Sequence, residues 1–343
     1  VPGYTPKTPD GNPLVPVEPG HPENGYKVPP VPTEPGTNTD ITYVADPQKA
    51  VVKVFNTTTG TEVELPAEKV SIDNGTTDAA IPTTDLNTKI ADLEKRGYVV
   101  ENKNLLENQK FDKVTDPETG DPTQVFKLKV HEKVVEVTEP PTPNTPVDPN
   151  VPVEPNKPVD PTVPKWPAEG LKESDLKKEV TRTITYVKKE TPNGEEVASG
   201  KDPVTQTAHF TRKASYNVVT GAITYGKWES TDNNLAAVPT DKLDGYVADK
   251  ASVEGVETSV DSTDLDKKVV YTKLGSWIPN KPGEKTPTPI PYPNHPTDPT
   301  KPGTPVYPEP GTPTDPNTPK PPVIPYVPGY TPKTPDGNPL VPV

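Results

Sequence analysis

Residues Thr123–His131 read TQVFKLKVH and give the clearest strand signal in the chain. Phe126, Leu128 and Val130 alternate with lysine and histidine, which is the period of two of a strand with one buried face. Earlier in the chain, Lys49–Phe55 reads KAVVKVF and is rich in β-branched residues. The two stretches predict two strands of one sheet.

Between these strands, Thr83–Arg96 has the pattern of an amphipathic helix. Leu86, Ile90 and Leu93 recur at the spacing of one helical face. Thr83 is a candidate N-cap, and Gly97 follows the last turn as a stop signal.

Two further short strands complete this region. Asn56–Gly60 has the composition of a turn, so Thr61–Leu65 is expected as the return strand of a hairpin. Gly97–Glu101 reads GYVVE and is expected to be a strand. The predicted order is ββαββ, an α+β pattern in which one helix covers one face of the sheet.

A second region is richer in strands. Val180–Val187 and Gln206–Thr211 alternate, while Ala222–Trp228 and Lys268–Leu274 are β-rich stretches that follow polar segments. The only helical expectation here is a short turn within Leu235–Leu243.

Proline divides the chain. Of 53 prolines among 343 residues, only five lie in residues 41–138 and three in residues 177–277. These ranges are expected to be two domains. Residues 1–40, 139–176 and 278–343 are expected to be proline-rich linkers.

The linkers have a regular period. Proline occupies every third position over Pro143–Pro167, and the same period returns over Pro296–Pro308 and Pro310–Pro328. Polyproline II has three residues per turn, so a rod is expected. At ~3.1 Å per residue, Pro140–Pro167 would span on the order of 85 Å.

The longest internal repeat is VPGYTPKTPDGNPLVPV. It occupies Val1–Val17 and returns without a change at Val327–Val343. An identity of this length indicates a repeat protein. We expect a monomeric fragment of a tandem array, starting in one repeat's linker and stopping in the next.

Composition excludes several classes of function. The chain has no cysteine and a formal net charge of −13. Disulfides and thiolate metal sites are therefore impossible, and nucleic acid or an anionic membrane is a poor partner. The sequence shows no stretch expected to insert into a membrane.

Catalytic motifs are also missing. The four histidines are spread over linkers and polar strand positions, and no nucleophile elbow, zinc-protease motif or phosphate-binding glycine loop is present. The chain is therefore not expected to be an enzyme.

No cofactor is expected, with calcium as the one open alternative. Calcium needs six to eight oxygen ligands from a flexible loop, and two acidic loops could contribute some. The first contains Asp112, Asp116, Glu118 and Asp121. The second contains Asp261, Asp264 and Asp266. Neither has EF-hand spacing, so solvated acidic loops are the preferred interpretation.

Two tryptophans stand at the borders of the second domain. Trp166 and Trp277 are either plugs of domain junctions or exposed platforms on which sugar rings stack. The junction interpretation is preferred, and both residues are kept as candidate binding residues.

These motifs resemble two known modules. The first domain resembles the mucin-binding (MucBP) module of Gram-positive surface proteins, and the second resembles the second module of the lactobacillar mucus-binding (Mub) repeat. The first resemblance rests on Lys49–Gly60, Gly97–Val100, Gln124–Phe126 and Lys129–His131. The second rests on Thr181–Tyr186, Gln206, Thr207, Phe210–Arg212, Val219–Gly221, Trp228 and Asp244–Tyr246.

The resemblance implies two ubiquitin-like β-grasp modules and a secreted protein displayed on the cell wall. It implies adhesion to mucin glycans, and for some Mub repeats also binding of immunoglobulins. The expected function is a non-enzymatic adhesin repeat whose weak sites act together through avidity. Immunoglobulin binding at a sheet edge and a passive cell-wall stalk are the alternatives.

Overall fold

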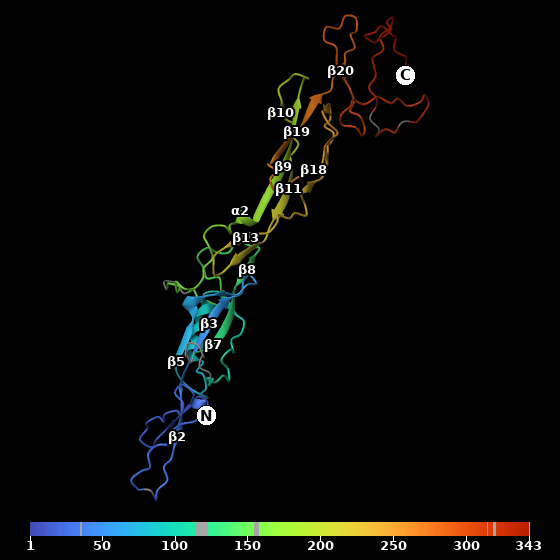
Figure 1. The fold of residues 1–343 in the computed structure, drawn as a ribbon. Helices are drawn as coiled ribbons and strands as arrows, with labels where there is room; N and C mark the ends of the chain where they lie inside the picture. The colour runs from blue at the N-terminus through green and yellow to red at the C-terminus, as the bar shows by residue number, and fades with distance from the viewer. Residues whose placement is uncertain (35, 114–122, 154–157, 314, 318–319, 343) are drawn as a thin grey trace. The chain divides into compact units, whose positions relative to one another are not determined.

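The structure is a computed structural model that describes residues 1–34, 36–113, 123–153, 158–313, 315–317 and 320–342. It is mostly β-sheet with few helices (Figure 1). Two compact units are present. The first contains Val1–Leu176 and Lys213–Gly226, and the second contains Lys177–Arg212 and Lys227–Val343. None of the described helices is long and apolar enough to cross a membrane.

Among its described residues, the first unit holds ten strands, one α-helix of three turns, a short helix and two 3-10 helices. The strands are β1 (Tyr4–Lys7), β2 (Thr42–Ala45), β3 (Pro47–Asn56), β4 (Val63–Glu64), β5 (Val70–Thr76), β6 (Tyr98–Val100), β7 (Thr123–Glu132), β8 (Val134–Val137), β12 (Ala214–Asn217) and β13 (Ile223–Tyr225). The helices are α1 (Thr84–Lys95), α2 (Glu173–Leu176) and the 3-10 turns Pro22–Asn24 and Pro66–Glu68.

The main sheet of this unit is built on a parallel pair, β3 and β7, in which Lys49 lies opposite Thr123. β4 and β5 flank β3, and β6 flanks β7, all antiparallel. The strands expected at Lys49–Phe55 and Thr123–His131 are confirmed. The expected return strand is shorter than the sequence indicates, because only Val63 and Glu64 pair with β3.

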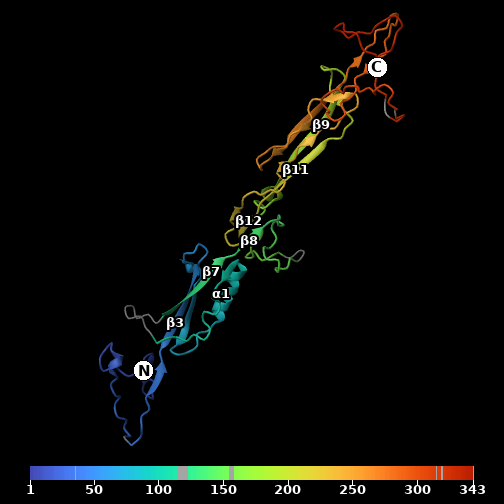
Figure 2. The ribbon, with the colours of Figure 1, turned by 90° about the vertical axis from the view of Figure 1, so that its right-hand side faces the viewer.

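Helix α1 covers one face of this sheet (Figure 2). Leu86, Ile90 and Leu93 are buried as the periodicity predicts. Gly97 follows the helix with a φ of 96°, a conformation that favours glycine. Thr83 stands at the N-cap position, but its side chain does not make the expected hydrogen bond to a backbone N–H of the first turn.

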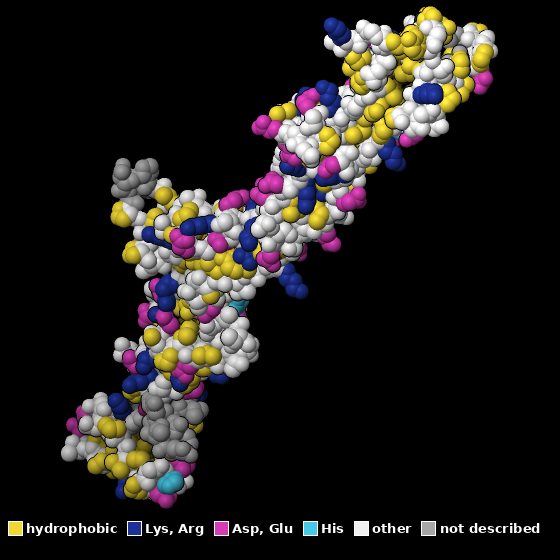
Figure 3. Space-filling model, turned by 90° about the horizontal axis from the view of Figure 1, so that it is seen from above, with side chains coloured by type: hydrophobic (Ala, Val, Ile, Leu, Met, Phe, Trp, Pro, Cys, Tyr) yellow, Lys and Arg dark blue, Asp and Glu magenta, His cyan; other side chains and the backbone are white. Residues whose placement is uncertain are grey.

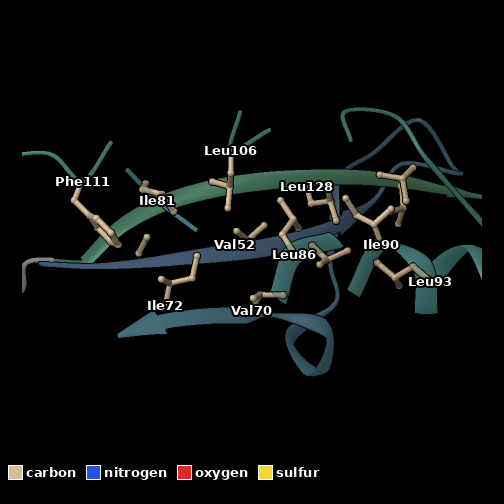
Figure 4. Close-up of a cluster of buried hydrophobic side chains, with 14 residues drawn as sticks. Val52, Val70, Ile72, Ile81, Leu86, Ile90, Leu93, Leu106, Phe111 and Leu128 are labelled. Atoms are coloured by element: carbon tan, nitrogen blue, oxygen red, sulfur yellow. The ribbon is translucent and has the colours of Figure 1, made fainter. Parts of the chain in front are cut away.

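The core between helix and sheet is aliphatic. Val52, Leu86 and Leu128 point toward one another (Figure 4), and Val52 and Leu128 are fully buried. Strand β5 adds Val70 and Ile72 to this core. The sequence did not predict β5, since its second half, Asp-Asn-Gly, is typical of a turn.

A smaller sheet joins distant parts of the chain within the first unit. Its strand order is β13-β12-β8, with Ala214 opposite Val137. The hairpin of residues 213–226 was expected in the domain spanning residues 177–277. It instead shares a sheet with β8 and a core cluster that includes Tyr216 and Leu176.

The described parts of residues 139–176 do not form one continuous rod. The backbone N–H of Asn144 donates to Trp166 O, and that of Val147 to Pro164 O, so the described parts double back. Val147 and Val163 are buried. Prolines at every third position leave the intervening N–H groups free, and here these groups pair across a loop instead of remaining solvated.

The described part of the second unit contains eleven strands. They are β9 (Lys177–Lys189), β10 (Val197–Ala198), β11 (Val204–Thr211), β14 (Asn234–Leu235), β15 (Val238–Pro239), β16 (Tyr246–Ala248), β17 (Ser252–Val253), β18 (Val256–Glu257), β19 (Leu265–Lys273), β20 (Ser276–Trp277) and β21 (Ile290–Pro291).

Its main sheet again has a central parallel pair, β9 and β19, with Leu265 opposite Arg182. β10 and β11 flank β9, and β16 flanks β19. The expected strands at Val180–Val187, Gln206–Thr211 and Lys268–Leu274 are confirmed, while Ala222–Trp228 shortens to β13. The helical turn expected within 235–243 is wrong, because this segment forms β15 and part of β14.

Candidate binding surface

The last two strands of the second unit hold Trp277 in a fixed position. β20 and β21 pair antiparallel, and the N–H of Tyr292 donates to Gly275 O over 2.9 Å. The rings of Trp277 and Tyr292 meet edge to face, with centroids 4.7 Å apart and planes at 77°. This geometry is one that aromatic pairs prefer, so the indole is held by backbone pairing and by a second ring.

Trp277 also lines a cavity of about 1020 Å³ within the second unit. The aromatic residues of its lining are Trp277, Tyr292, Tyr307 and Tyr330. Most of the other lining residues are proline, threonine or aliphatic. Figure 3 shows hydrophobic side chains gathered at the right-hand end of the view, over the proline-rich C-terminal segment.

The charge of this cavity differs from that of the whole chain. Lys281 and Lys333 are the charged residues among those that line it, although the net charge of the chain is −13. Lys281 forms an ion pair with Glu284 over 3.2 Å. The cavity therefore combines aromatic faces, hydroxyl groups and positive charge, a set that suits a sugar with an anionic substituent.

Trp166 has different surroundings. Its ring lies 5.2 Å from the ring of Tyr216, at an interplanar angle of 38°, against the core cluster of the small sheet. The backbone N–H of Trp166 donates to Thr145 O over 2.9 Å. Trp166 thus packs inside the first unit and is not brought to the cavity that Trp277 lines.

The acidic candidates that the structure describes are not gathered into a metal site. Asp264 Oδ1 accepts a hydrogen bond from the backbone N–H of Thr181 over 2.8 Å, which joins the start of β19 to β9. Asp261 and Asp266 are exposed. Across the residues that the structure describes, no three His, Cys, Asp or Glu side chains form a group able to hold a metal. Of the first acidic loop, Asp116, Glu118 and Asp121 lie outside the described residues.

A buried arginine is the polar feature that sequence reasoning missed. Arg182 is 1 % exposed, yet its guanidinium is held by Gln206 Oε1 and by two backbone carbonyls, those of Ala236 and Glu254. The alternation along β9 carried the signal, because Val180, Arg182 and Ile184 share the buried face. This arginine fixes loops against the sheet from inside, and because it is buried its guanidinium does not face the surface.

Comparison with known proteins found a family model and several solved structures that are similar to parts of this chain. A family model described as the Muc B2-like domain matches residues 171–275. Among solved structures, Mub-RV is 23 % identical, with 66 % of this chain and 98 % of that chain covered and a TM-score of 0.43. No curated protein matches the chain.

Two further structures are similar over parts of the chain. The type 2 repeat of the mucus binding protein MUB from Lactobacillus reuteri is 24 % identical, covering 66 % of this chain and 99 % of that one, with a TM-score of 0.32. The mucin-binding domain of Spr1345 from Streptococcus pneumoniae is 33 % identical, covering 29 % and 92 %, with a TM-score of 0.25. The match to the family model spans β9 through β19, and residues 171–275 are therefore a Muc B2-like domain.

Proposed function

We propose that this chain is a non-enzymatic repeat of a bacterial surface adhesin and that it binds mucin glycans. The observation that carries the proposal is the Muc B2-like domain at residues 171–275. A mucus-adhesion role follows from this family. The immunoglobulin-binding and passive-stalk alternatives find no support in the comparisons.

The binding site of the proposal is the aromatic cavity at Trp277. A sugar ring has an apolar face that packs on an aromatic ring, and hydroxyl groups that form hydrogen bonds around its edge. Trp277 and Tyr292 supply rings held at a fixed angle, and Tyr307 supplies another. Sites of this kind are concave and mostly apolar, with a few polar groups that set orientation.

Electrostatics restricts how such a site works. Mucins that carry sialate or sulfate are polyanions, and the net charge of this chain is −13. Long-range electrostatic repulsion therefore opposes the encounter. Binding must depend on short-range contacts, with Lys281 or Lys333 reaching an anionic substituent only once the sugar is in place.

The finer fold assignment is part of the same proposal. In each main sheet, the central pair is parallel and joins an early strand to a late one, as in β3 with β7 and β9 with β19. This topology supports two ubiquitin-like β-grasp modules. The tandem copies of Val1–Val17 support repetition, and linked weak sites gain avidity of ~10²–10⁴ without better single contacts.

We place this adhesin repeat outside the cell and attached to the cell wall, where mucus is accessible, and it requires no cofactor. The test uses the full chain on a surface of immobilised mucin, with enzymatically deglycosylated mucin and immunoglobulin on parallel surfaces. Binding only to intact mucin supports the proposal. Equal binding to deglycosylated mucin points to a protein partner, and binding only to immunoglobulin contradicts the glycan proposal.

A further inference from the structure

The two copies of VPGYTPKTPDGNPLVPV have the same internal backbone structure. In the first copy, the N–H of Thr8 donates to Asn12 O over 2.9 Å, and that of Leu14 to Pro6 O over 2.9 Å. The matching bonds in the second copy are Thr334 to Asn338 O at 2.8 Å and Leu340 to Pro332 O at 2.9 Å.

The glycines of the two copies agree as well. Gly3 has a φ of 77° and its counterpart Gly329 a φ of 78°, and Gly11 and Gly337 have φ values of 80° and 83°. The second copy therefore holds the backbone conformation of the first in surroundings of its own. A segment that is already in its bound conformation has less entropy to lose on docking.

The surroundings of the two copies differ. In the first copy, β1 pairs antiparallel with β2, and Tyr4 lies opposite Ala45. The Tyr4 hydroxyl donates to Asp78 Oδ2 over 2.9 Å, and the Thr5 hydroxyl to Asp46 Oδ1 over 2.5 Å.

Two tight contacts also hold the first copy against its docking site, which consists of β2, Asp46 and Asp78. Gly3 O accepts from the N–H of Asp46 over 2.9 Å. A Cβ on Gly3 would lie 2.6 Å from Cγ2 of Thr77, so only glycine fits against that side chain. Pro6 is buried in this arrangement.

Among the described residues, the second copy makes no such docking contacts. Tyr330, the counterpart of Tyr4, is 59 % exposed, and Thr331, Pro332 and Lys333 are exposed as well. A Cβ on Gly329 would meet no atom within 4 Å. The second copy thus carries every determinant of the first, and its residues 330–333 are exposed, although they also line the cavity at Trp277.

We propose that residues 327–343 are a docking strand for a second copy of this chain, where they take the place of residues 1–17 on β2, Asp46 and Asp78. Because the two sequences are identical, both fit the same site with the same contacts. In one isolated chain the first copy holds the site, since a tethered segment acts at an effective concentration near millimolar. In an array, the same contact joins each unit to the segment that precedes it.

The test uses full-length single substitutions at the matched glycines. Gly3→Val clashes with Thr77 and releases the first copy, and the vacant site then accepts residues 327–343 of another molecule. Such a contact is head-to-tail and does not close, so it produces open chains. By light scattering, the unsubstituted chain is expected to be a monomer. Gly3→Val is expected to at least double in mass as its concentration rises.

The double variant Gly3→Val with Gly329→Val is the matched control and should return to monomer. Excess synthetic peptide VPGYTPKTPDGNPLVPV should also disperse the Gly3→Val chains. Tyr4→Ala with Thr5→Ala is a milder second way to release the first copy, and tryptophan emission checks that each variant is folded. A monomeric Gly3→Val that is folded overturns the proposal, as does a double variant that still associates.

Discussion

Nε of Arg182 donates to Oε1 of Gln206 over 2.9 Å, and this pair lies inside the second unit with the arginine almost fully buried. Nη1 of the same guanidinium donates to Glu254 O over 2.7 Å. A buried charge is tolerated only when its donors are satisfied. In this unit the partners are dipoles of an amide and of backbone carbonyls.

We predict that Arg182→Met destabilises the second unit strongly. The substitution removes the donors to Gln206 Oε1 and Glu254 O, while Ala236 O keeps the bond from Nε2 of Gln206. Each polar group that loses its partner costs about 1–3 kcal/mol. A loss of at least about 3 kcal/mol corresponds to a fall of roughly 6–12 °C in the unfolding temperature for a domain of this size. Calorimetry of the full chain measures it. Lys267→Met, at an exposed position of β19, is the control that should change little.

Gly75→Ala should destabilise the first unit. A Cβ at this position would lie 2.3 Å from the ring of Phe111, which is 2 % exposed. Overpacking of this kind typically costs about 1–3 kcal/mol. Gly36→Ala is the matched control, because a Cβ there meets no atom within 4 Å. Equal thermal shifts for the two variants would show that the Phe111 ring does not pack on Gly75.

Tyr216→Ala tests whether the hairpin of residues 213–226 packs with Trp166. The Tyr216 hydroxyl donates to Lys165 O over 3.1 Å, and its ring lies against Trp166. Removing a buried aromatic ring costs about 3–5 kcal/mol. A red shift of tryptophan emission and a lower unfolding temperature are expected. Tyr326→Ala, which removes a ring that is 82 % exposed, should produce neither effect.

The ion pair of His209 and Asp232 predicts a small pH dependence of stability. The hydrogen bond from the imidazolium to Asp232, 2.6 Å long, raises the pKa of His209 above its usual 6.5. The same bond lowers the pKa of Asp232 from 3.8 to about 2. Glu179, 3.6 Å from Nε2 of His209, also favours the charged imidazole.

The directions of these two pKa shifts determine how the stability of the second unit changes with pH. The contribution of His209 is complete below pH 6.5 and is lost as pH rises through its raised folded value. The contribution of Asp232 is present above pH 3.8 and is lost as pH falls toward 2. His209→Gln should therefore lower the unfolding temperature more at pH 5 than at pH 8.5. Both groups are exposed, so the effect is small. An equal shift at the two pH values would contradict this account.

The sequence predicted those elements whose pattern is local. Period-two alternation gave β7 and β11, and helical spacing gave α1 with its buried residues. β5 was not predicted from the sequence, because its Gly75 is required by the ring of Phe111, which lies far along the chain. β12 was not predicted either, because its partner strand β8 is distant in sequence. The folding back of the described parts of residues 139–176 was not predicted. The spacing of prolines reports local backbone conformation, whereas the folding back depends on hydrogen bonds across the loop, such as the one between Asn144 and Trp166.

The candidate site was only partly accessible to sequence reasoning. The position of Trp277 at a domain border indicated either a plug or a platform, and the structure adds Tyr292, Tyr307 and the cavity beside it. Tyr307 lies within the proline repeat of Pro296–Pro308, whose period of three reports local conformation only, and Tyr292 lies outside that repeat, so no sequence pattern linked either residue to Trp277. Trp166 had the same sequence signal, yet it packs on Tyr216 within the first unit.

The central claim is that mucin glycans bind through short-range contacts at Trp277. The most direct measurement compares the full chain and its Trp277→Ala variant for binding to immobilised mucin, before and after periodate oxidation of the sugars. A central aromatic contact contributes about 2 kcal/mol or more, so the variant should bind about 30-fold more weakly. Periodate should abolish binding, and added salt should hardly change it because screening at ~8 Å does not reach such contacts. Unchanged binding by Trp277→Ala to intact mucin would contradict the site, and unchanged binding to periodate-treated mucin would contradict glycan recognition itself.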